Sequence, residues 1–340
     1  MSDTSMTAIT YDSYGGPEVL SISEVERPQP ADDQVSIRVQ AAEACKSDTE
    51  MRSCSFSASW LSVPMRLVLG VRRPRRPVLG LYFAGVIEAV GADVTDFEVG
   101  DEVYGTTGLR LGSYGEHLVL PAKATIAPKP ATMTFAEAAA LPLGACNALN
   151  GLRRAQVGAG DTVLVNGAGG VIGAYGVQIA RMLGAEVTGV DAAHKESFVR
   201  SMGATTFVDY QATDLATLDD RYDVIFDMVP STPIRRMLAL LGPDGRYVSG
   251  NPRFTTMLRA SRLPLTDDRI QTATDGESRA AFTELAAMVD EGHLVGIVDR
   301  VLPMEQVAEA HRLVDTEQRL GAIVLAIGPD AEQRRASTTT

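Results

Sequence analysis

The sequence contains only three cysteines, Cys45, Cys54 and Cys146, among 340 residues. An odd number of scattered cysteines does not form a disulfide framework, so we expect reduced thiols and a cytoplasmic location. No apolar run reaches the roughly 18 residues that a membrane-spanning helix needs. The first twenty residues also lack the basic start and apolar stretch of a secretory signal. We therefore expect a soluble protein with no membrane partner.

Positive charge is also in short supply. Lysine and arginine together number 31 against 43 aspartates and glutamates, which gives a net charge of −12. This charge repels polyanions, so we expect no nucleic-acid partner. Hydrophobic residues make up 45% of the chain and charged residues 22%, as in globular proteins that bury a full core. The length fits two domains of about 150 residues each.

Residues 1–126 have the pattern of short strands separated by glycine turns. The stretch QVSIRVQAA alternates apolar and polar residues, as a half-buried strand does, and FAGVIEAVG, DEVYGTTG and GEHLVLPAK follow it. This part has no returning strand of its own, so we expect residues 276–328 to complete it. Residues 329–340 are polar, and we expect them to be disordered.

The middle of the chain, residues 127–275, alternates short apolar runs with helix-length segments. The runs lie at residues 163–165, 186–190, 207–210, 224–228 and 247–249. Such alternation predicts an α/β domain, in which a parallel sheet carries helices on both faces.

One loop in this domain is rich in glycine. The strand DTVLV runs into NGAGGVIG, with Gly167, Gly170 and Gly173 at three-residue steps, and a helical pattern follows at once. Glycines allow a tight turn and a close approach of the backbone, and the helix N-terminus offers free N–H donors and partial positive charge. This arrangement predicts a diphosphate site. The alternative is a plain turn between strand and helix.

Asp191 closes the next strand. A carboxylate there can accept hydrogen bonds from the hydroxyls of an adenosine ribose and repels a 2′-phosphate, which favours NADH over NADPH. His194 and Lys195 follow closely and could neutralise a phosphate. The competing interpretation of Asp191 is a helix N-cap.

The same residues carry a family resemblance. DTVLVNGAGGVIGAYGVQIARMLGAEVTGVD, RSMGATTFVDY, YDVIFDMV and GRYVSG resemble the medium-chain dehydrogenase/reductase superfamily, in its zinc-independent quinone oxidoreductase-like branch. YGGPEVLSISEVERPQP, RRPRRPVLG, FAGVIEAVGADVTDFEVGDEVYG and GSYGEHLVLPAKATIAPKPATMTFAEAAALP agree, so the resemblance covers residues 8 to 328. It implies a GroES-like β-rich catalytic domain, a Rossmann doubly wound parallel-sheet domain, a nicotinamide cofactor in the cleft between them, and a homodimer.

The resemblance also assigns cofactor contacts by position. Those near the nicotinamide fall at Cys146, Asn147, Met228 and Val229, and Ser249 is a further cofactor-binding candidate. The diphosphate contacts fall at Gly167, Ala168, Gly170, Val171, Ile172 and Gly173, and the adenosine contacts at Asp191, Lys195 and Tyr210. The branch often carries a lysine after a glycine in its last strand, whereas Ala322 follows Gly321 here, which removes a positive charge.

Zinc ligands of the alcohol-oxidising relatives are mostly replaced. Cys45 aligns with the usual cysteine, but the next ligand position is Leu81 and the third is Leu143. Leucine cannot bind a metal, so we expect no catalytic zinc. Cys45 is then either a small buried hydrophobic residue or a free thiol in the cleft.

Without a metal, hydrogen-bond donors must stabilise the oxygen of the substrate. Hydride addition to an enone or quinone gives an enolate, which needs donors and a proton. The segments CKSD and GLYFAG supply the candidate catalytic residues, namely Tyr82, Lys46, Asp48, Cys45 and Ser47. Our hypothesis makes Tyr82 the proton donor or oxyanion partner, assisted by Lys46 or Asp48. A tyrosine that only packs is the alternative.

Three functions therefore remain open. The first is zinc-independent, NAD(P)H-dependent reduction of a conjugated carbonyl, quinone or related secondary metabolite. The second is a specialised biosynthetic alcohol dehydrogenase, and the third is a dinucleotide-binding protein without turnover. The basic run VRRPRRP at residues 71–77 could meet an anionic substrate carrier or form a solvated loop, and we expect His117, His293 and His311 to be structural or exposed.

Overall fold

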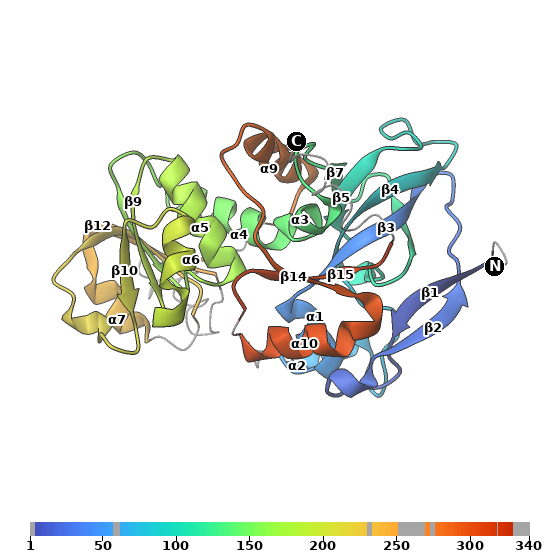
Figure 1. Cartoon of the computed structure of the whole chain (residues 1–340), viewed down its shortest axis with the longest axis horizontal. Helices are drawn as coiled ribbons and strands as arrows, with labels where there is room; N and C mark the ends of the chain where they lie inside the picture. The colour runs from blue at the N-terminus through green and yellow to red at the C-terminus, as the bar shows by residue number, and fades with distance from the viewer. Residues whose placement is uncertain are drawn as a thin grey trace. The chain divides into compact units, whose positions relative to one another are not determined.

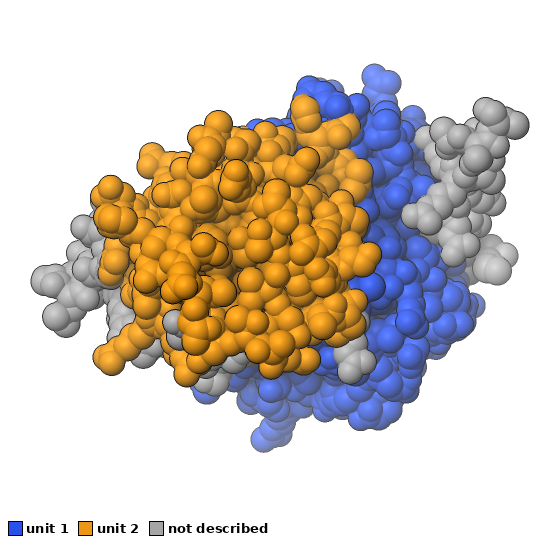
Figure 2. All heavy atoms as spheres, turned by 60° about the vertical axis from the view of Figure 1, so that its left-hand side comes forward, with its two compact units in different colours: residues 1–142, 277–291, 296–340 blue, residues 143–276, 292–295 orange. Residues whose placement is uncertain are grey.

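The computed structural model describes residues 4–56, 62–229, 233–250, 269–272, 276–317 and 319–328, so the expected disordered tail lies outside the described residues. The chain divides into two compact units, coloured separately in Figure 2. We call residues 1–142, 277–291 and 296–340 the β-rich unit. Residues 143–276 and 292–295 form the Rossmann unit.

The Rossmann unit is built on a six-stranded sheet whose strands are all parallel (Figure 1). Its strands are β8 (Thr162–Asn166), β9 (Glu186–Asp191), β10 (Thr206–Asp209), β11 (Tyr222–Asp227), β12 (Leu241–Ser249) and β13 (Ile270–Thr272). They lie in the order β10-β9-β8-β11-β12-β13. This order, with its reversal between β8 and β11, defines a doubly wound dinucleotide-binding sheet.

Helices cover both faces of this sheet. Successive residues of a strand point to opposite sides, so each face presents apolar side chains to the helices that pack on it. Leu164 and Ile225 pack with Met237 of α7 (Ile234–Ala239) on one face. On the other face, a Cβ atom at Gly176 of α5 (Val171–Met182) would come within 2.9 Å of the Phe226 ring. The doubly wound fold that the sequence predicts is therefore confirmed. The unit also contains α4 (Leu141–Arg154) from Leu143 onward, α6 (Glu196–Ser201), η4 (Ala193–Lys195) and η5 (Leu215–Thr217).

The β-rich unit is organised around the long strand β3. Its strands are β1 (Ser5–Thr10), β2 (Ser21–Glu26), β3 (Gln34–Ala44), β4 (Tyr82–Val90), β5 (Glu102–Thr106), β6 (His117–Pro121), β7 (Ile126–Pro128), β14 (Val298–Pro303) and β15 (Ala322–Ala326). The main sheet follows the order β14-β15-β3-β4-β5-β7, β6 pairs with β3, and β1 pairs with β2. The C-terminal strand β15 therefore returns to pair antiparallel with β3.

The helices of the β-rich unit are α1 (Lys46–Ser53), α2 (Ser62–Leu69), α3 (Phe135–Ala139), α9 (Arg279–Asp290) and α10 (Val307–Thr316), with η1 (Pro17–Val19), η3 (Gly108–Arg110) and η6 (Met304–Gln306). We expected this part of the chain to end at residue 126, but it continues to Pro142. The reason is that β7 pairs with β5 and α3 packs against β3 and β4. Residues 292–295, in turn, join the Rossmann unit.

Candidate active site

The glycine loop connects β8 to α5. Gly167 adopts a left-handed backbone with φ of +84°, a conformation that favours glycine. Its amide and that of Ala168 donate to the carbonyl oxygen of Val190 at 2.9 and 3.1 Å, which ties the loop to the end of β9. A Cβ atom at Gly173 would collide with the carbonyl oxygen of Gly167, so only glycine lets the first turn of α5 lie against the loop.

The start of α5 has no side-chain cap. Gly170 is its N-cap residue and accordingly makes no side-chain cap hydrogen bond. The N–H groups of a first helical turn have no partner within the helix, and they carry the positive end of the helix dipole. The amides of Val171, Ile172 and Gly173 can therefore bind an anion, so the loop fits a cofactor diphosphate.

Asp191 holds the loop from the end of β9. Its Oδ2 accepts the Gly169 amide and its Oδ1 accepts the Ala192 amide, each at 2.8 Å. The Lys195 ammonium lies 3.5 Å from Oδ1, and both residues are buried. The Tyr210 amide donates to the Asp191 carbonyl oxygen at 3.3 Å. The structure thus brings the three predicted adenosine residues together beside the loop.

The end of β11 lies on the other side of the loop. A side chain at Gly167 would approach Val229 Cγ2 to 3.0 Å and Met228 Cβ to 3.5 Å. The turn is fixed by Asp227, which was not among the predicted residues. Its Oδ1 accepts the Asn166 amide at 2.8 Å and the Val229 backbone N–H at 2.9 Å.

Tyr247 completes this polar network by donating from Oη to Asp227 Oδ2 at 2.7 Å. Burial raises the pKa of Asp227, and the hydrogen bonds from Tyr247, Val229 and Asn166 lower it. Ser249 is buried and stands opposite Asp227 in the strand register. Asn147, by contrast, donates its side-chain amide to Leu143 of its own helix at 2.7 Å.

In the β-rich unit, Cys45 and Asp48 form a closed pair at the start of α1. The backbone amide and the thiol of Cys45 both donate to Asp48 Oδ2, at 3.1 and 3.2 Å. Neither residue is exposed to solvent. Burial raises the pKa of Asp48 to about 6 in spite of these bonds. Burial and the nearby Asp48 charge also raise the pKa of the Cys45 thiol, so Cys45 is a protonated, buried residue.

Tyr82, at the first position of β4, is hydrogen-bonded to a residue far along the chain. Its Oη donates to Glu277 Oε1 at 2.6 Å across 195 positions of sequence. Burial raises the pKa of Glu277, whereas the hydrogen bonds from Tyr82 and Thr106 lower it. Burial and the neighbouring Glu277 charge raise the pKa of Tyr82 itself. No sequence pattern pointed to Glu277, because nothing local links these two residues.

Glu43 of β3 is a third buried carboxyl group in this region. It is fully buried, and neither of its oxygens has a hydrogen-bond partner among the residues that the structure describes. Burial raises its pKa to about 8, with the Arg319 charge opposing the shift and Asp48 and Glu277 adding to it. Glu43, Asp48 and Glu277 are therefore close enough for their charges to interact.

A buried chain of hydrogen bonds also links α1 to α10. Arg52 donates from Nη1 to His311 Nδ1 at 3.0 Å, which leaves the ring proton on Nε2 to be donated to Tyr114 Oη at 3.1 Å. Burial and the Arg52 charge lower the pKa of His311 to about 3. His311 is therefore neutral and structural, while the hydroxyl of Tyr114 helps to lower the pKa of Asp48.

Comparisons with known proteins agree with this geometry. Residues 31–131 match the model of the alcohol dehydrogenase GroES-like domain, and residues 202–325 match that of the zinc-binding dehydrogenase domain. The NADPH-dependent alkenal/one oxidoreductase of Arabidopsis thaliana chloroplasts is 30% identical over 94% of this chain and 79% of that protein.

The chain belongs to the medium-chain dehydrogenase/reductase superfamily. Within this superfamily it falls in the quinone oxidoreductase-like branch. The quinone oxidoreductase of Homo sapiens is 30% identical over 90% of this chain and 93% of that protein. The solved quinone oxidoreductase of Coxiella burnetii superposes with a TM-score of 0.82 and 25% identity, over 95% of this chain and all of that one. The resemblance identified from the sequence is therefore confirmed.

Positions that hold zinc in alcohol-oxidising members of the superfamily do not fit a metal here. Leu81 and Leu143 are aliphatic, and the Cys45 thiol donates to Asp48. Among the residues that the structure describes, no group of three or more His, Cys, Asp and Glu side chains could hold a metal ion.

Lys46 and Ser47 follow Cys45 on the first turn of α1. The Lys46 ammonium lies 3.6 Å from Glu317 and 3.9 Å from Asp315, near the end of α10. Ser47 is half-buried. Of the five predicted catalytic residues, Cys45 and Asp48 are therefore in direct contact, Tyr82 is bonded to Glu277, and Lys46 is paired with acidic side chains.

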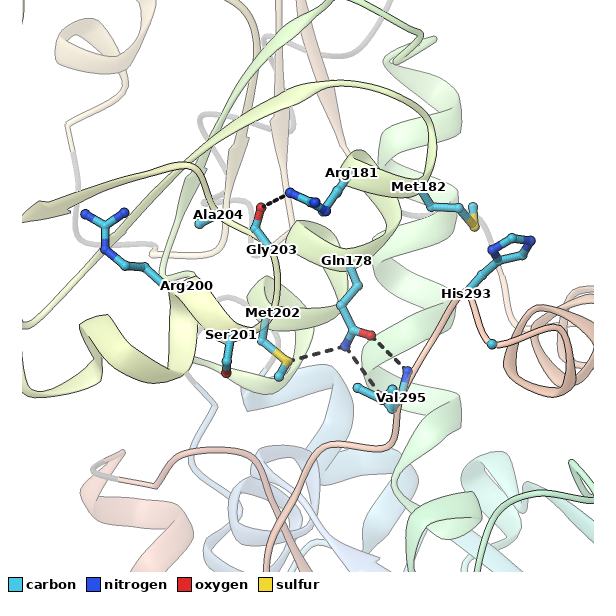
Figure 3. Close-up of a pocket in the computed structure, with 11 residues that line it drawn as sticks. Gln178, Arg181, Met182, Arg200, Ser201, Met202, Gly203, Ala204, His293 and Val295 are labelled. Atoms are coloured by element: carbon cyan, nitrogen blue, oxygen red, sulfur yellow. Dashed lines mark hydrogen bonds between the residues drawn. The ribbon is translucent and has the colours of Figure 1, made fainter.

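A hollow of about 560 Å³ lies on the Rossmann unit beside α5 and α6, and its lining includes Gln178, Arg181, Arg200, Met202 and His293 (Figure 3). Gln178 accepts the Val295 amide at 2.9 Å and so fastens residues 292–295 to α5. The residues that line this hollow do not belong to the glycine loop.

In the part of the chain that the structure describes, no helix combines the length and apolar character that crossing a membrane requires.

Proposed function

We propose that this protein is an NAD(P)H-dependent oxidoreductase that transfers hydride to a conjugated carbonyl compound or a quinone. The observation that carries the proposal is the glycine loop, where Gly173 leaves room for the first turn of α5 and Asp191 fixes the loop amides. A bound reduced nicotinamide would supply the hydride. The similarity to an alkenal/one oxidoreductase and to quinone oxidoreductases supports this substrate class.

We further propose that the reaction proceeds without zinc. Hydride addition to a conjugated acceptor spreads negative charge over the substrate, so hydrogen-bond donors can replace a metal. Tyr82 is the donor that we assign to this charge, while Asp48 and Cys45 form its buried polar surroundings. The first turn of α1 adds the Ser47 hydroxyl. Lys46 receives no step, because its ammonium faces Asp315 and Glu317.

Cofactor choice depends on Asp191 and Lys195. The Asp191 carboxylate accepts the loop amide of Gly169 and the amide of Ala192, and the Lys195 ammonium balances its charge. A bare carboxylate would repel the 2′-phosphate of NADPH, but this pair is neutral overall. We therefore propose that the protein binds both NADH and NADPH, with Lys195 reducing the preference for NADH that Asp191 alone would give.

The test is a set of turnover assays with purified protein, with NADH and NADPH offered separately. Alkenals, cyclic enones and quinones serve as acceptors, and loss of reduced cofactor is followed by absorbance. We expect consumption with conjugated acceptors and none with saturated ketones. Preferential oxidation of alcohols by the oxidised cofactor would instead indicate an alcohol dehydrogenase. Cofactor binding without consumption across the panel would indicate a non-catalytic dinucleotide-binding protein.

Two further expectations stay predictions. The homodimer comes from the family resemblance alone, and its check is the molar mass in solution by light scattering. The cytoplasmic location rests on the odd number of scattered cysteines, and its check is fractionation of the source cells.

A further inference from the structure

Reduction of a conjugated carbonyl consumes a proton as well as a hydride. The hydride pair reduces the carbon–carbon double bond and leaves an enolate, which becomes the saturated carbonyl product only when a proton arrives. The need for this proton rests on the proposed function, reduction of a conjugated acceptor. The cofactor does not supply that proton, so the protein or solvent must.

Tyr82 alone cannot both contact Glu277 and serve the substrate. A phenol carries one proton, and Tyr82 directs it at Glu277 Oε1 over 2.6 Å. When Glu277 is a carboxylate, that proton is held by the carboxylate. When Glu277 is a carboxylic acid, it can donate to Tyr82 Oη instead, and the phenol proton is free to turn to another acceptor. The protonation state of Glu277 therefore decides whether Tyr82 can donate to a substrate.

We propose that Glu277 is the proton-relay residue behind Tyr82. The Tyr82 O–H bond breaks as the enolate gains its proton, and the Glu277 O–H bond breaks as Tyr82 regains one. The Glu277 carboxylate then takes a proton from solvent before the next turnover. Glu277 acts through Tyr82 and does not itself contact substrate, so it is a positioning residue.

The fold holds Glu277 in place for this role. It immediately precedes Ser278, the N-cap of α9, whose Oγ accepts the Ala281 amide at 3.2 Å. The first residue of α9, Arg279, is paired with Asp96 at 3.0 Å. Tyr104 of β5 donates to the carbonyl oxygen of Phe282 at 2.5 Å. Because α9 is fastened to β5 and to the loop before it, Glu277 is fixed against Tyr82.

The surroundings favour a protonated Glu277. Glu43 of β3 and Cys45 before α1 act electrostatically on Tyr82, and Asp48 and Glu277 act on Glu43. Three interacting carboxyl groups cannot all be ionised in a buried site without a large electrostatic cost. Thr106 of β5 hydrogen-bonds Glu277, and Arg319 is the cation that acts on Glu43. Burial raises the pKa of Glu277, and it raises the pKa of Glu43 to about 8, so the cluster retains the Glu43 proton at neutral pH.

The experiment compares the pH dependence of kcat for enone reduction in the wild type, Glu277→Gln and Tyr82→Phe, with exposed Glu305→Gln as the matched control. We expect wild-type kcat to fall as pH rises through the raised pKa of Glu277. In Glu277→Gln the plateau should fall by about 100-fold, and this titration should disappear. Because Glu277 acts through Tyr82, the double variant Glu277→Gln/Tyr82→Phe should be no slower than Tyr82→Phe alone. An unchanged pH profile and full turnover in Glu277→Gln would overturn the relay.

A second variant, Thr106→Val, tests the same titration without changing Glu277. A titration of Tyr82 tests the contact without any substrate. Thr106→Val removes a hydrogen bond to the Glu277 carboxylate, so the alkaline fall in kcat should move to higher pH. The ionisation of Tyr82 is measured from the ultraviolet absorbance of tyrosinate, as the difference between each protein and the same protein carrying Tyr82→Phe. Tyr82 should have a lower pKa in Glu277→Gln than in the wild type. An unchanged Tyr82 titration would overturn the relay even in the absence of turnover. Absence of turnover with a shifted titration would overturn the proposed function instead.

Discussion

The Asp191 carboxylate holds the glycine loop in place through a hydrogen bond from the loop backbone. Its two oxygens accept the amides of Gly169 and Ala192, and its charge is balanced by Lys195. An acidic residue at this position predicted a ribose contact and a preference for NADH. The structure adds that the same carboxylate fixes the diphosphate loop, so its removal changes more than ribose recognition.

We predict different effects for the two members of this pair. Asp191→Ala leaves the Gly169 amide of the loop and the Ala192 amide without their acceptor and should weaken NADH and NADPH alike, by about 10- to 100-fold. Lys195→Met leaves an unbalanced carboxylate and should weaken NADPH by about 10-fold more than NADH. Fluorescence titration of the reduced cofactors measures both, and exposed Lys123→Met is the control. Equal losses of NADH and NADPH in Lys195→Met would contradict the assignment.

Glu43 should make the folded protein less stable as pH rises from about 4.5 to 8. Its pKa is about 8 in the folded protein, where burial raises it above the usual 4.5. As pH rises from about 4.5 to 8 the unfolded chain loses this proton first, so the free energy of unfolding falls by up to about 1.4 kcal/mol per pH unit.

Glu43→Gln removes that titration and should flatten the decline in stability between pH 7 and 8. Urea unfolding at each pH measures the slope for both proteins. Glutamine keeps the shape of the side chain, so the comparison isolates the charge. Identical slopes in the wild type and the variant would show that Glu43 is ionised in the folded state across this range.

At the scale of single elements, the start of α5 depends on glycine. A Cβ atom at Gly173 would collide with the Gly167 carbonyl oxygen, which is backbone and cannot swing aside. We predict that Gly173→Ala lowers the free energy of unfolding by about 1–3 kcal/mol and weakens cofactor binding. Gly158→Ala is the matched control, since a Cβ there meets nothing within 4 Å. Unchanged cofactor affinity in Gly173→Ala would contradict the close approach of loop and helix.

Elements that depend on local pattern could be predicted from the sequence. The five apolar runs correspond to β8, β9, β10, β11 and β12, because strand periodicity and the glycine loop are local signals. The end of the first unit was placed too early, since the pairing of β7 with β5 is a long-range contact. Glu277 was missed for the same reason, as its partner Tyr82 is 195 positions away.

Buried polar side chains were the least predictable feature. Glu43 lies in a strand whose pattern, VQAAEA, gives no sign that this carboxyl group is fully buried. His311 was expected to be structural or exposed and is buried between Arg52 and Tyr114. Such networks are assembled by α1, β4, α9 and α10 together, so no single stretch of sequence contains them.

For the whole molecule, the two units divide the chemistry. The Rossmann unit keeps the glycine loop, the acidic residue at the end of β9 and the doubly wound strand order. The β-rich unit keeps the cysteine of the zinc-binding relatives at Cys45 but has the aliphatic Leu81 at the next ligand position, followed by the phenol of Tyr82. We infer that cofactor binding is retained while the substrate side is specialised.

Hydride transfer from a bound nicotinamide to a conjugated acceptor leaves the transferred hydrogen at a defined carbon of the product. Its most direct test supplies reduced cofactor carrying deuterium at the transferable position, together with a cyclic enone, and analyses the product by NMR. We predict a saturated ketone with deuterium on the carbon β to the carbonyl group. An allylic alcohol carrying deuterium at the former carbonyl carbon, or no deuterium in any product, would contradict it.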